Sequence, residues 1–393
     1  MQQPIVHTYS LGELYTERKE KGDPLLPILT VSIHTGVSEG ELDEDKLGKK
    51  VKRIADKTQY KTARKGDLVF NMMRAWQGAI GVVRSEGLVS PAYIVAKPNG
   101  KIWPEYMDYC MKTPRMIHAI HRQSYGVTDF RLRLYWDSFT PITCQLPTLP
   151  EQQKIAAILS TQDKVIELKE KLLVQKQQQK KYLMQQLLTG KKRLPGFDRK
   201  WNYVKANEIF KSIVDKSYDG KLEVLSSTQD KGIVPRSQVD IDIKYNENSL
   251  STYKKVCEGD FVISLRSFQG GIEYSNYAGI VSPAYTVLRA IVKIDAGYYK
   301  QFFKSSNYIK RLNVAVYGIR DGKQISYDDF GQIKIPVPPI EEQREVAKML
   351  STADHEIDLL QKSIEAEKQK KKALMQLLLT GKVRVEDEQK QDG

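Results

Sequence analysis

The sequence predicts an α+β protein, in which two mixed α/β domains form a tandem pseudo-twofold repeat and are separated and joined by two long antiparallel helices. Residues 87–93 (GLVSPAY) return as residues 279–285 (GIVSPAY), and residues 183–191 (LMQQLLTGK) return as residues 374–382 (LMQLLLTGK). This period is far longer than the repeating unit of a solenoid or a propeller. The repeat therefore indicates two copies of one module, each followed by a helix.

The domain boundaries follow from the order of features along the chain. A Pro-rich segment lies before each expected helix, at residues 146–150 and again at residues 335–339. Proline favours an extended approach and tolerates the first turn of a helix, so both segments are typical of stiff helix entries. We expect a first globular domain at 1–146, a first repeated helix at 147–193, a second globular domain at 194–337, a second repeated helix at 338–384 and a polar C-terminal tail at 385–393.

Both globular domains contain short apolar runs bounded by turn-forming residues, which is typical of strands. Each domain also has one helical stretch, and Pro114 breaks the first of them. The expected strands are residues 25–32, 67–70, 222–225 and 259–264, and the expected helical stretches are residues 106–123 and 296–313.

The two repeated helices carry apolar residues at steps of three, four and seven, which is helical spacing. Both end at a Thr-Gly pair, a common helix stop, and about 39 residues would give roughly 58 Å of helix. Because each stripe must be buried against something, we expect the helices to pair as an antiparallel coiled coil. A solvated helix face and a face exposed to DNA or to a partner subunit are the alternatives. The expected seam residues are Ile155, Ile158, Leu159, Ile166, Leu172, Leu183, Val346, Met349, Leu350, Ile357, Leu360 and Leu374.

Composition restricts the class of protein. The formal net charge is +14, and residues 1–149 and 194–340 each carry +5, as expected if both domains contact a polyanion; an ordinary excess of surface lysine is the alternative. Cys110, Cys144 and Cys257 form no Cys-x-x-Cys pair, so we expect neither a disulfide framework nor a zinc site. No apolar run is long enough for a membrane span, and we expect a cytoplasmic protein.

The sequences at the helix ends identify a family. The helices begin with residues 149–153 (LPEQQ) and 339–344 (PIEEQR), and they end with residues 186–191 (QLLTGK) and 377–382 (LLLTGK). Together with the alternation of two variable domains, this pattern resembles the specificity subunit of a type I restriction-modification system. The resemblance covers almost the whole chain, and the twofold recurrence makes it specific.

The resemblance implies both a function and a set of partners. Each globular domain would be a target-recognition domain that reads one half of a split, asymmetric sequence in double-stranded DNA. The coiled coil would set the gap between the half-sites and dock two modification subunits, which methylate adenine. Two motor-nuclease restriction subunits would complete an ATP-dependent endonuclease. S-adenosylmethionine, ATP and Mg would be bound by those partners, and this chain would bind no cofactor and catalyse nothing.

One motif shared by the domains suggests base contacts. Residues 73–78 (MRAWQG) align with residues 265–270 (LRSFQG). Arginine can bind guanine or phosphate with two hydrogen bonds, and glutamine can pair with adenine. Trp76 and Phe268 are more typical of core aromatic residues that anchor a strand. The candidate DNA-binding residues of this motif are Arg74, Gln77, Arg266 and Gln269.

A second motif aligns residues 125–131 with residues 317–323, which share Tyr-Gly and Asp but differ at their long polar side chains. Such divergence on a common frame is expected of a base-reading loop, although an ordinary basic loop is the alternative. The candidate DNA-binding residues here are Thr128, Arg131, Arg133, Arg320, Lys323 and Gln324. Residues identical in both copies discriminate poorly between bases, so a structural role or a phosphate contact is expected for Ser90, Tyr93, Tyr125, Ser282, Tyr285 and Tyr317.

The sequence lacks the motifs that an enzyme would need. It has no Asn- or Asp-Pro-Pro-Tyr/Phe motif for amino-methyl transfer and no Gly-x-Gly cradle for a cofactor. His118 and His121 form a His-x-x-His pair without a third ligand in reach, so no metal site is expected. A self-contained methyltransferase or nuclease is therefore disfavoured. A coiled-coil scaffold without DNA specificity is the main alternative function.

Overall fold

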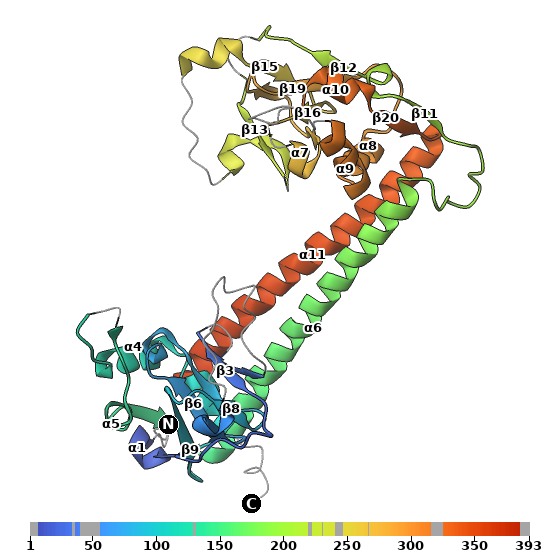
Figure 1. Ribbon diagram of the computed structural model, residues 1–393. Helices are drawn as coiled ribbons and strands as arrows, with labels where there is room; N and C mark the ends of the chain where they lie inside the picture. Colours follow the sequence, from blue (N-terminus) through green and yellow to red (C-terminus); the bar gives the residue numbers. More distant parts are fainter. Residues whose placement is uncertain are drawn as a thin grey trace, which may run out of the picture. The chain divides into compact units, whose positions relative to one another are not determined.

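The structure is a computed structural model that describes residues 7–33, 36–39, 56–128, 131–218, 222–229, 231–239, 247–265, 267–315 and 325–385. The expected α+β fold class is confirmed by small antiparallel sheets, short helices and a pair of very long helices (Figure 1). The chain divides into two compact units, Met1–Leu168 with Ile364–Gly393 (unit 1) and Lys169–Ser363 (unit 2). Each unit thus combines one globular domain with parts of both long helices.

The central sheet of unit 1 is antiparallel. Its strands, among the described residues, follow the order β2 (Tyr15–Glu17), β9 (Tyr93–Pro98), β6 (Leu68–Asn71) and β7 (Ile80–Val82). Further two-stranded ladders pair β1 (His7–Ser10) with β10 (Thr143–Leu146), β3 (Leu29–Ser32) with β4 (Gly36–Glu39), and β5 (Lys61–Ala63) with β8 (Gly87–Val89). The helical elements of its globular domain are α1 (Leu11–Leu14), η1 (Lys57–Gln59), η2 (Ala75–Gln77), α3 (Pro104–Cys110), α4 (Pro114–Gln123) and α5 (Trp136–Phe139).

Unit 2 repeats this plan. Its central sheet, within the described ranges, has the order β12 (Phe210–Ile213), β19 (Thr286–Ala290), β16 (Phe261–Ile263) and β17 (Glu273–Tyr274). Its ladders pair β11 (Asn202–Lys205) with β20 (Lys334–Val337), β13 (Leu225–Thr228) with β14 (Gly232–Pro235), and β15 (Lys254–Val256) with β18 (Gly279–Val281). Its short helices are η4 (Ala206–Glu208), η5 (Arg236–Gln238), η6 (Glu247–Thr252), α7 (Ser267–Gly270), α8 (Ala296–Phe303), α9 (Ser306–Ala315) and α10 (Tyr327–Gln332). The internal repeat of the sequence is therefore a repeat of topology.

Two of the expected strands begin later than predicted. Only the end of the run 25–32 pairs, as β3, and Leu25 is 92% exposed. Pro27 has no N–H to donate to a ladder, which explains the late start. The run 222–225 was likewise placed too early, because β13 begins at its last residue. The expected helical break at Pro114 is present between α3 and α4.

The long helices are α6 (Leu149–Leu187) and α11 (Ile340–Leu379). Both are followed closely by a glycine at positive φ, Gly190 at +69° and Gly381 at +70°, a conformation that glycine adopts readily. Their contacts run antiparallel within unit 2, where Lys169 Nζ donates to Ser363 Oγ at 2.8 Å and Lys176 Nζ pairs with Glu356 at 2.7 Å. In unit 1, Gln162 donates to the Glu367 carboxylate at 2.8 Å. Polar contacts therefore join the two helices within each unit.

The seam residues divide into groups by burial. Ile155, Leu159, Val346 and Leu350 are buried, and they contact the cores of the globular domains. The partly buried members are Ile166, Leu183, Ile357, Leu360 and Leu374.

Three seam assignments were wrong. Ile158, Leu172 and Met349 are 37%, 43% and 40% exposed, so they do not lie in a buried seam. Ile158 and Met349 each precede a buried leucine, and consecutive helical positions point about 100° apart around the axis. Both neighbours cannot face the same partner. No helix in the described part of the chain has an apolar window long enough to cross a membrane.

The hydrophobic core of each unit extends from the sheet and short helices onto the long helices. In unit 1, Ile155 and Leu159 of α6 and Leu378 of α11 join the main core of the globular domain. In unit 2, Leu350 of α11 and Leu187 of α6 do the same. Each globular domain is thus packed onto the start of the helix that follows it in sequence and the end of the other helix.

Candidate nucleic-acid interface

The Arg74 turn follows the central strand β6 of unit 1. Its backbone is held by Asn71, whose side-chain Oδ1 accepts a hydrogen bond from the Met73 N–H at 3.0 Å. Gly78 ends η2 at a φ of +99°, where a residue with a side chain would be strained. The candidate residues Arg74 and Gln77 are both exposed. The strand end therefore projects two long polar side chains into solvent.

Trp76 has a structural position in this turn. Its indole Nε1 donates to the Met73 carbonyl at 3.1 Å, and its ring meets the ring of His121 on α4 edge-on at 5.6 Å. The side chain is partly buried against the main core of unit 1. These contacts support the interpretation of Trp76 as an aromatic anchor.

The corresponding turn of unit 2 contains α7. The Ser267 hydroxyl accepts a hydrogen bond from the Ser264 N–H at 2.8 Å, and Gln269 is exposed. Arg266 and the side chain of Phe268 lie outside the described residues. The predicted contacts of Arg266 and Gln269 with DNA stay predictions.

The loop after α4 carries the second group of candidates in unit 1. Tyr125 and Arg133 exchange backbone hydrogen bonds of 3.1 and 3.0 Å, which close the loop. Gly126 approaches the Arg131 carbonyl so closely that a Cβ would collide with it. Thr128, Arg131 and Arg133 are all exposed, and Tyr125 is 59% exposed.

The structure brings this loop and the Arg74 turn together. The Leu134 N–H donates to the Met72 carbonyl at 2.9 Å, so the chain beside Arg133 is bonded to the chain beside Arg74. Residues almost 60 positions apart in sequence thus share one exposed edge of unit 1. The equivalent candidates of unit 2, Tyr317, Arg320, Lys323 and Gln324, lie outside the described residues.

The repeated Ser-Pro-Ala-Tyr segments form identical turns. Tyr93 N–H donates to the Ser90 carbonyl at 2.9 Å, and Tyr285 N–H donates to the Ser282 carbonyl at 3.0 Å. Each serine hydroxyl also accepts a 3.3 Å hydrogen bond from the alanine N–H two residues on. These bonds support the structural interpretation of all four residues.

A lysine supports each of these turns. Lys61 Nζ donates to the Tyr93 carbonyl at 2.7 Å, and Lys254 Nζ donates to the Tyr285 carbonyl at 2.6 Å. Burial lowers the pKa of both ammonium groups, because the charged form loses hydration. Sequence inspection did not single out these lysines, although they occupy equivalent positions in the two modules.

An ion pair closes each unit at its helix ends. In unit 2 the Glu342 carboxylate accepts two 2.6 Å hydrogen bonds from the Arg193 guanidinium and one of 2.8 Å from Trp201 Nε1. In unit 1, Glu151 accepts the equivalent pair of bonds from Arg384. We call these pairs the helix-end clasps. The hydrogen bonds to Glu342 raise the pKa of the Arg193 guanidinium.

The helix-end clasps explain the Glu-Gln sequences at the helix starts. The glutamines Gln152 and Gln343 also bind backbone, accepting from the Trp103 N–H at 2.8 Å and from the Asp295 N–H at 2.9 Å. The arginine partners of the two glutamates were not predicted from the sequence. The signal was present, since Arg193 and Arg384 recur with the same offset as the glutamates.

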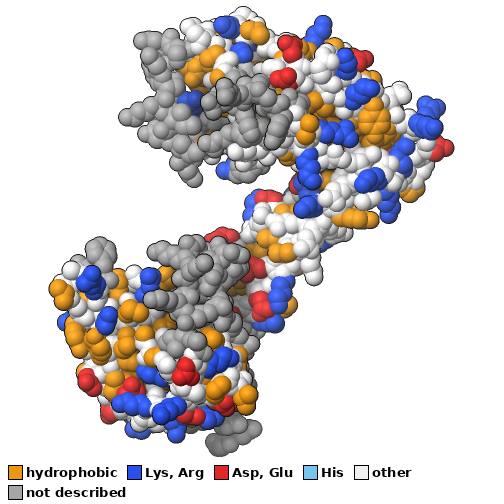
Figure 2. Space-filling model, in the orientation of Figure 1, with side chains coloured by type: hydrophobic (Ala, Val, Ile, Leu, Met, Phe, Trp, Pro, Cys, Tyr) orange, Lys and Arg blue, Asp and Glu red, His pale blue; other side chains and the backbone are white. Residues whose placement is uncertain are grey.

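Basic side chains are widespread on the surface, and two of the cysteine thiols are buried. Lys and Arg side chains are spread over the face of both units that Figure 2 shows. Within the described ranges, no group of three or more His, Cys, Asp or Glu side chains is placed to hold a metal ion. Burial raises the pKa of the Cys110 thiol to about 11 and of the Cys144 thiol to about 12, so both are protonated at neutral pH.

The fold is that of a two-domain protein, and the Arg74 turn and the Tyr125 loop of its first domain present exposed arginine and glutamine side chains. Residues 198–368 match the family model of the type I restriction modification DNA specificity domain. This segment of the chain is therefore similar to the DNA specificity domain of type I restriction-modification systems.

Two curated relatives extend this similarity beyond the matched segment. The putative type I restriction enzyme MjaX specificity subunit of Methanocaldococcus jannaschii is 26% identical over 97% of this chain and 92% of its own length. The MjaVIII specificity subunit of the same organism is 27% identical over 77% of this chain and 76% of its own length.

Among solved structures, the HsdS subunit from Thermoanaerobacter tengcongensis has a TM-score of 0.53 at 19% identity and covers 97% of this chain and 98% of its own. The S subunit of a type I restriction-modification system from M. genitalium has a TM-score of 0.57 at 12% identity, covering 96% of this chain and 97% of its own. These structures support the fold. The family match favours the specificity subunit over the scaffold alternative.

Proposed function

We propose that each globular domain reads one half of a split, asymmetric sequence in double-stranded DNA. The observation that supports this most directly is the repeated recognition frame. Both units have the same sheet order and the same Ser-Pro-Ala-Tyr turns, yet the aligned loops differ at their long polar side chains. A common frame with different reading residues suits two different half-sites.

Base recognition is assigned to the edge where the Arg74 turn meets the Tyr125 loop. Arg74, Arg131 and Arg133 supply donors for guanine or phosphate, and Gln77 supplies the donor and acceptor that adenine requires. Backbone hydrogen bonds hold the Arg74 turn and the Tyr125 loop in place, so both segments present these side chains from a fixed backbone. Rigid presentation reduces the ordering cost of binding.

We assign to the helix pair the role of fixing the distance between the two half-sites. Contacts with bases in one half-site carry no information about the position of the other half-site. A spacer of fixed length supplies that information, and α6 and α11 connect the two units over 39 and 40 residues. As a specificity subunit, the chain provides recognition and spacing and is not itself an enzyme.

The partners follow from the same assignment. Two modification subunits dock on the helix pair and methylate adenine with S-adenosylmethionine, and two restriction subunits add ATP- and Mg-dependent translocation and cleavage. This chain binds none of those cofactors, and the complex acts in the cytoplasm. Support comes from the family match and from the duplicated architecture, which offers equivalent surfaces to two copies of a partner.

The test is to co-express the chain with the modification subunit encoded beside it and to map methylated adenines across the host genome. We expect one split motif, with two short blocks and a fixed unspecified gap. The modification subunit expressed alone is the control, and it should leave the genome unmethylated. A stable complex that methylates no site, or that methylates adenines without a split motif, would contradict the proposal.

A further inference from the structure

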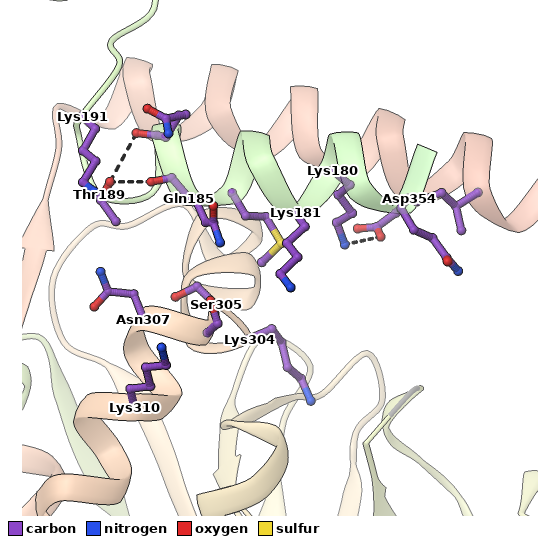
Figure 3. A pocket seen from close by; sticks show the side chains of 15 residues that line it. Lys180, Lys181, Gln185, Thr189, Lys191, Lys304, Ser305, Asn307, Lys310 and Asp354 are labelled. Carbon is purple, nitrogen blue, oxygen red and sulfur yellow. Dashed lines mark hydrogen bonds and ion pairs between the residues drawn. The ribbon is translucent and has the colours of Figure 1, made fainter. Parts of the chain in front are cut away.

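A lysine-lined groove lies in unit 2, and none of its lining residues belongs to the residues predicted to read bases. It has a volume of about 860 Å³ and lies between the last turns of α6 and the junction of α8 with α9 (Figure 3). Its lining contains five lysines and a single carboxylate: Lys180, Lys181, Lys191, Lys304, Lys310 and Asp354. The remaining lining is mostly amide and hydroxyl side chains, including Gln185, Thr189, Ser305 and Asn307.

The lysines of the groove divide into paired and unpaired groups. Lys180 is held by Asp354, which also accepts a hydrogen bond from Gln301 at 2.6 Å. Lys304 is held by the buried Glu273. Three lysines remain exposed, Lys181, Lys191 and Lys310, and no carboxylate in the described part of the chain pairs with them. Figure 3 shows Lys181 and Lys310 extending from opposite walls, α6 and α9.

Unit 1 repeats this arrangement of charge. Lys371 pairs with Asp163 at 2.5 Å, which matches the pair of Lys180 with Asp354. Arg115 stands at the start of α4, as Asn307 stands at the start of α9, and it lines a cavity together with Thr380. The further cations of unit 1 at matching sequence positions are Lys112, Lys372 and Lys382. The positive charge is thus retained in both modules, whereas the predicted reading loops have diverged.

We propose that the groove holds backbone phosphates of the bound DNA, outside the bases that are read. This inference rests on the proposed function. Lysine, serine, threonine, asparagine and glutamine are the side chains that typically contact phosphate, and such contacts position a protein without reading sequence. A site that reads no sequence has no reason to diverge between the modules, which agrees with the retained charge.

The lining also argues against a protein occupant. Met184 and Ile357 are the two large apolar side chains among its lining residues, and none of the lining residues is aromatic. Stable protein interfaces depend on buried aromatic or large apolar anchors, and their centres are depleted in lysine. Charge complementarity with a polyanion is the better match for this surface.

The distance to the reading edge suits a continuous duplex. In unit 1, α4 begins beside Arg115 and ends just before the Tyr125 loop. Its ten residues span about 15 Å, which corresponds to about four base pairs of DNA. A duplex that contacts the loop of unit 1 therefore passes within a few phosphates of Arg115, which stands where Asn307 lines the groove of unit 2.

The experiment replaces Lys181, Lys191 and Lys310 with Gln and measures DNA binding by the complex with its modification subunit. Two duplexes are compared over a series of salt concentrations, one with the mapped split sequence and one without it. We expect affinity to fall about tenfold on both duplexes, and the slope of log affinity against log salt to fall by about 1 to 3. The ratio of the two affinities should stay unchanged.

The matched control replaces Lys200, Lys211 and Lys293 with Gln. These lysines are exposed in the same unit, do not line the groove and remove the same charge. Equal effects of both triple variants would overturn the proposal, as would a loss confined to the split sequence. If the groove variant instead fails to assemble with the modification subunit, the groove binds an acidic protein surface and the proposal is wrong. Absence of specific binding by the unmodified complex would overturn the proposed function as well.

Discussion

At the scale of single residues, the Arg74 turn and the Tyr125 loop show how recognition and structure are divided between neighbouring side chains. Trp76 and Gly78 set the shape of the turn, and Arg74 and Gln77 are left exposed. The residues that fix the frame recur in the second module as an aromatic residue and a glycine. Changes at the exposed positions can therefore alter the bases that are read without unfolding the domain.

Replacing Arg74 and Gln77 with Ala tests this division. Each bidentate base contact is worth about 1–3 kcal/mol of discrimination, so the variant should tolerate substitutions in one block of the target motif. Methylation mapping of the co-expressed complex measures this directly. Arg84→Ala, which removes another exposed arginine, should leave the motif intact. Relaxation of both blocks at once would contradict independent reading by the two domains.

The helix-end clasp of unit 2 predicts a large effect on stability. The Glu342 side chain is 1% exposed, so Arg193→Ala leaves a buried carboxylate without its cation. Breaking a buried pair in this way costs about 3 kcal/mol or more. Urea unfolding of the purified chain measures the loss. As the control, Lys176→Ala removes an exposed ion pair with Glu356 and should lower the free energy of unfolding by less than about 1 kcal/mol. Equal losses in the two variants would show that the buried ion pair stabilises the chain no more than an exposed one.

The buried cysteines give a chemical test of the core of unit 1. Because burial raises the pKa of Cys110 to about 11 and of Cys144 to about 12, few of their thiols are ionised at about pH 8. Iodoacetamide should label them slowly in the folded chain, and the rate should rise about tenfold for each unit of pH below the pKa. Mass spectrometry gives the labelled fraction, with the partly exposed Cys257 and the urea-unfolded chain as references. Rapid labelling of the folded chain would contradict the burial.

At the scale of elements, the sequence predicted the long helices well and the short strands less well. Pro-rich entries and Thr-Gly stops are local signals, and the helices begin and end within a few residues of them. Strand ends depend on ladder partners far away in the chain, so β3 and β13 begin later than their apolar runs. The helix-end clasps were not predicted, because Glu151 and Arg384 are separated by most of the chain and no local signal links them.

Helical periodicity alone did not show what covers each face. The repeat placed Ile158 and Leu159 together in one seam, yet the structure buries Leu159 in a domain core and exposes Ile158. For the candidate site, Arg74, Gln77, Arg131 and Arg133 are exposed, and their contacts with DNA stay predictions. Their common edge was not predicted, because the bond that joins the two segments links residues distant in sequence.

Adjacent residues of α11 provide a matched test of this difference. Leu350 is fully buried in the core of unit 2, whereas Met349 is 40% exposed. Leu350→Ala should lower the free energy of unfolding by about 2–5 kcal/mol, because it removes buried methyl groups and leaves a cavity. Met349→Ala should change it by less than about 1 kcal/mol, as surface substitutions usually do. Urea unfolding measures both free energies. A larger loss for Met349→Ala than for Leu350→Ala would contradict the burial of Leu350 in the core of unit 2.

At the scale of the whole molecule, the helix pair makes the gap in the target sequence a property of helix length. The test inserts seven residues after Leu168 in α6 and seven after Ser363 in α11, at the point where Lys169 contacts Ser363. Seven residues are one heptad, so the two helices keep their register. The insertions add about 10 Å of helix, which corresponds to about three base pairs. Methylation mapping should show unchanged blocks and a gap longer by about three.

The companion variant carries the insertion in α6 alone. It should fail to methylate, because the polar contacts between the helices, such as that of Lys176 with Glu356, lose their register. An unchanged gap after the double insertion would mean that something other than the helix pair sets the spacing.

The composition of the two units has a consequence for biosynthesis. Unit 2 is one continuous stretch of chain, whereas unit 1 needs residues 364–393, which are translated after unit 2 is complete. At roughly 5–20 residues per second, a ribosome needs roughly 10–40 s to proceed from the first segment of unit 1 to its last. During that interval Ile155 and Leu159 lack Leu378, their apolar neighbour from α11. The core of the first domain therefore stays incomplete until the last segment of the chain has been translated.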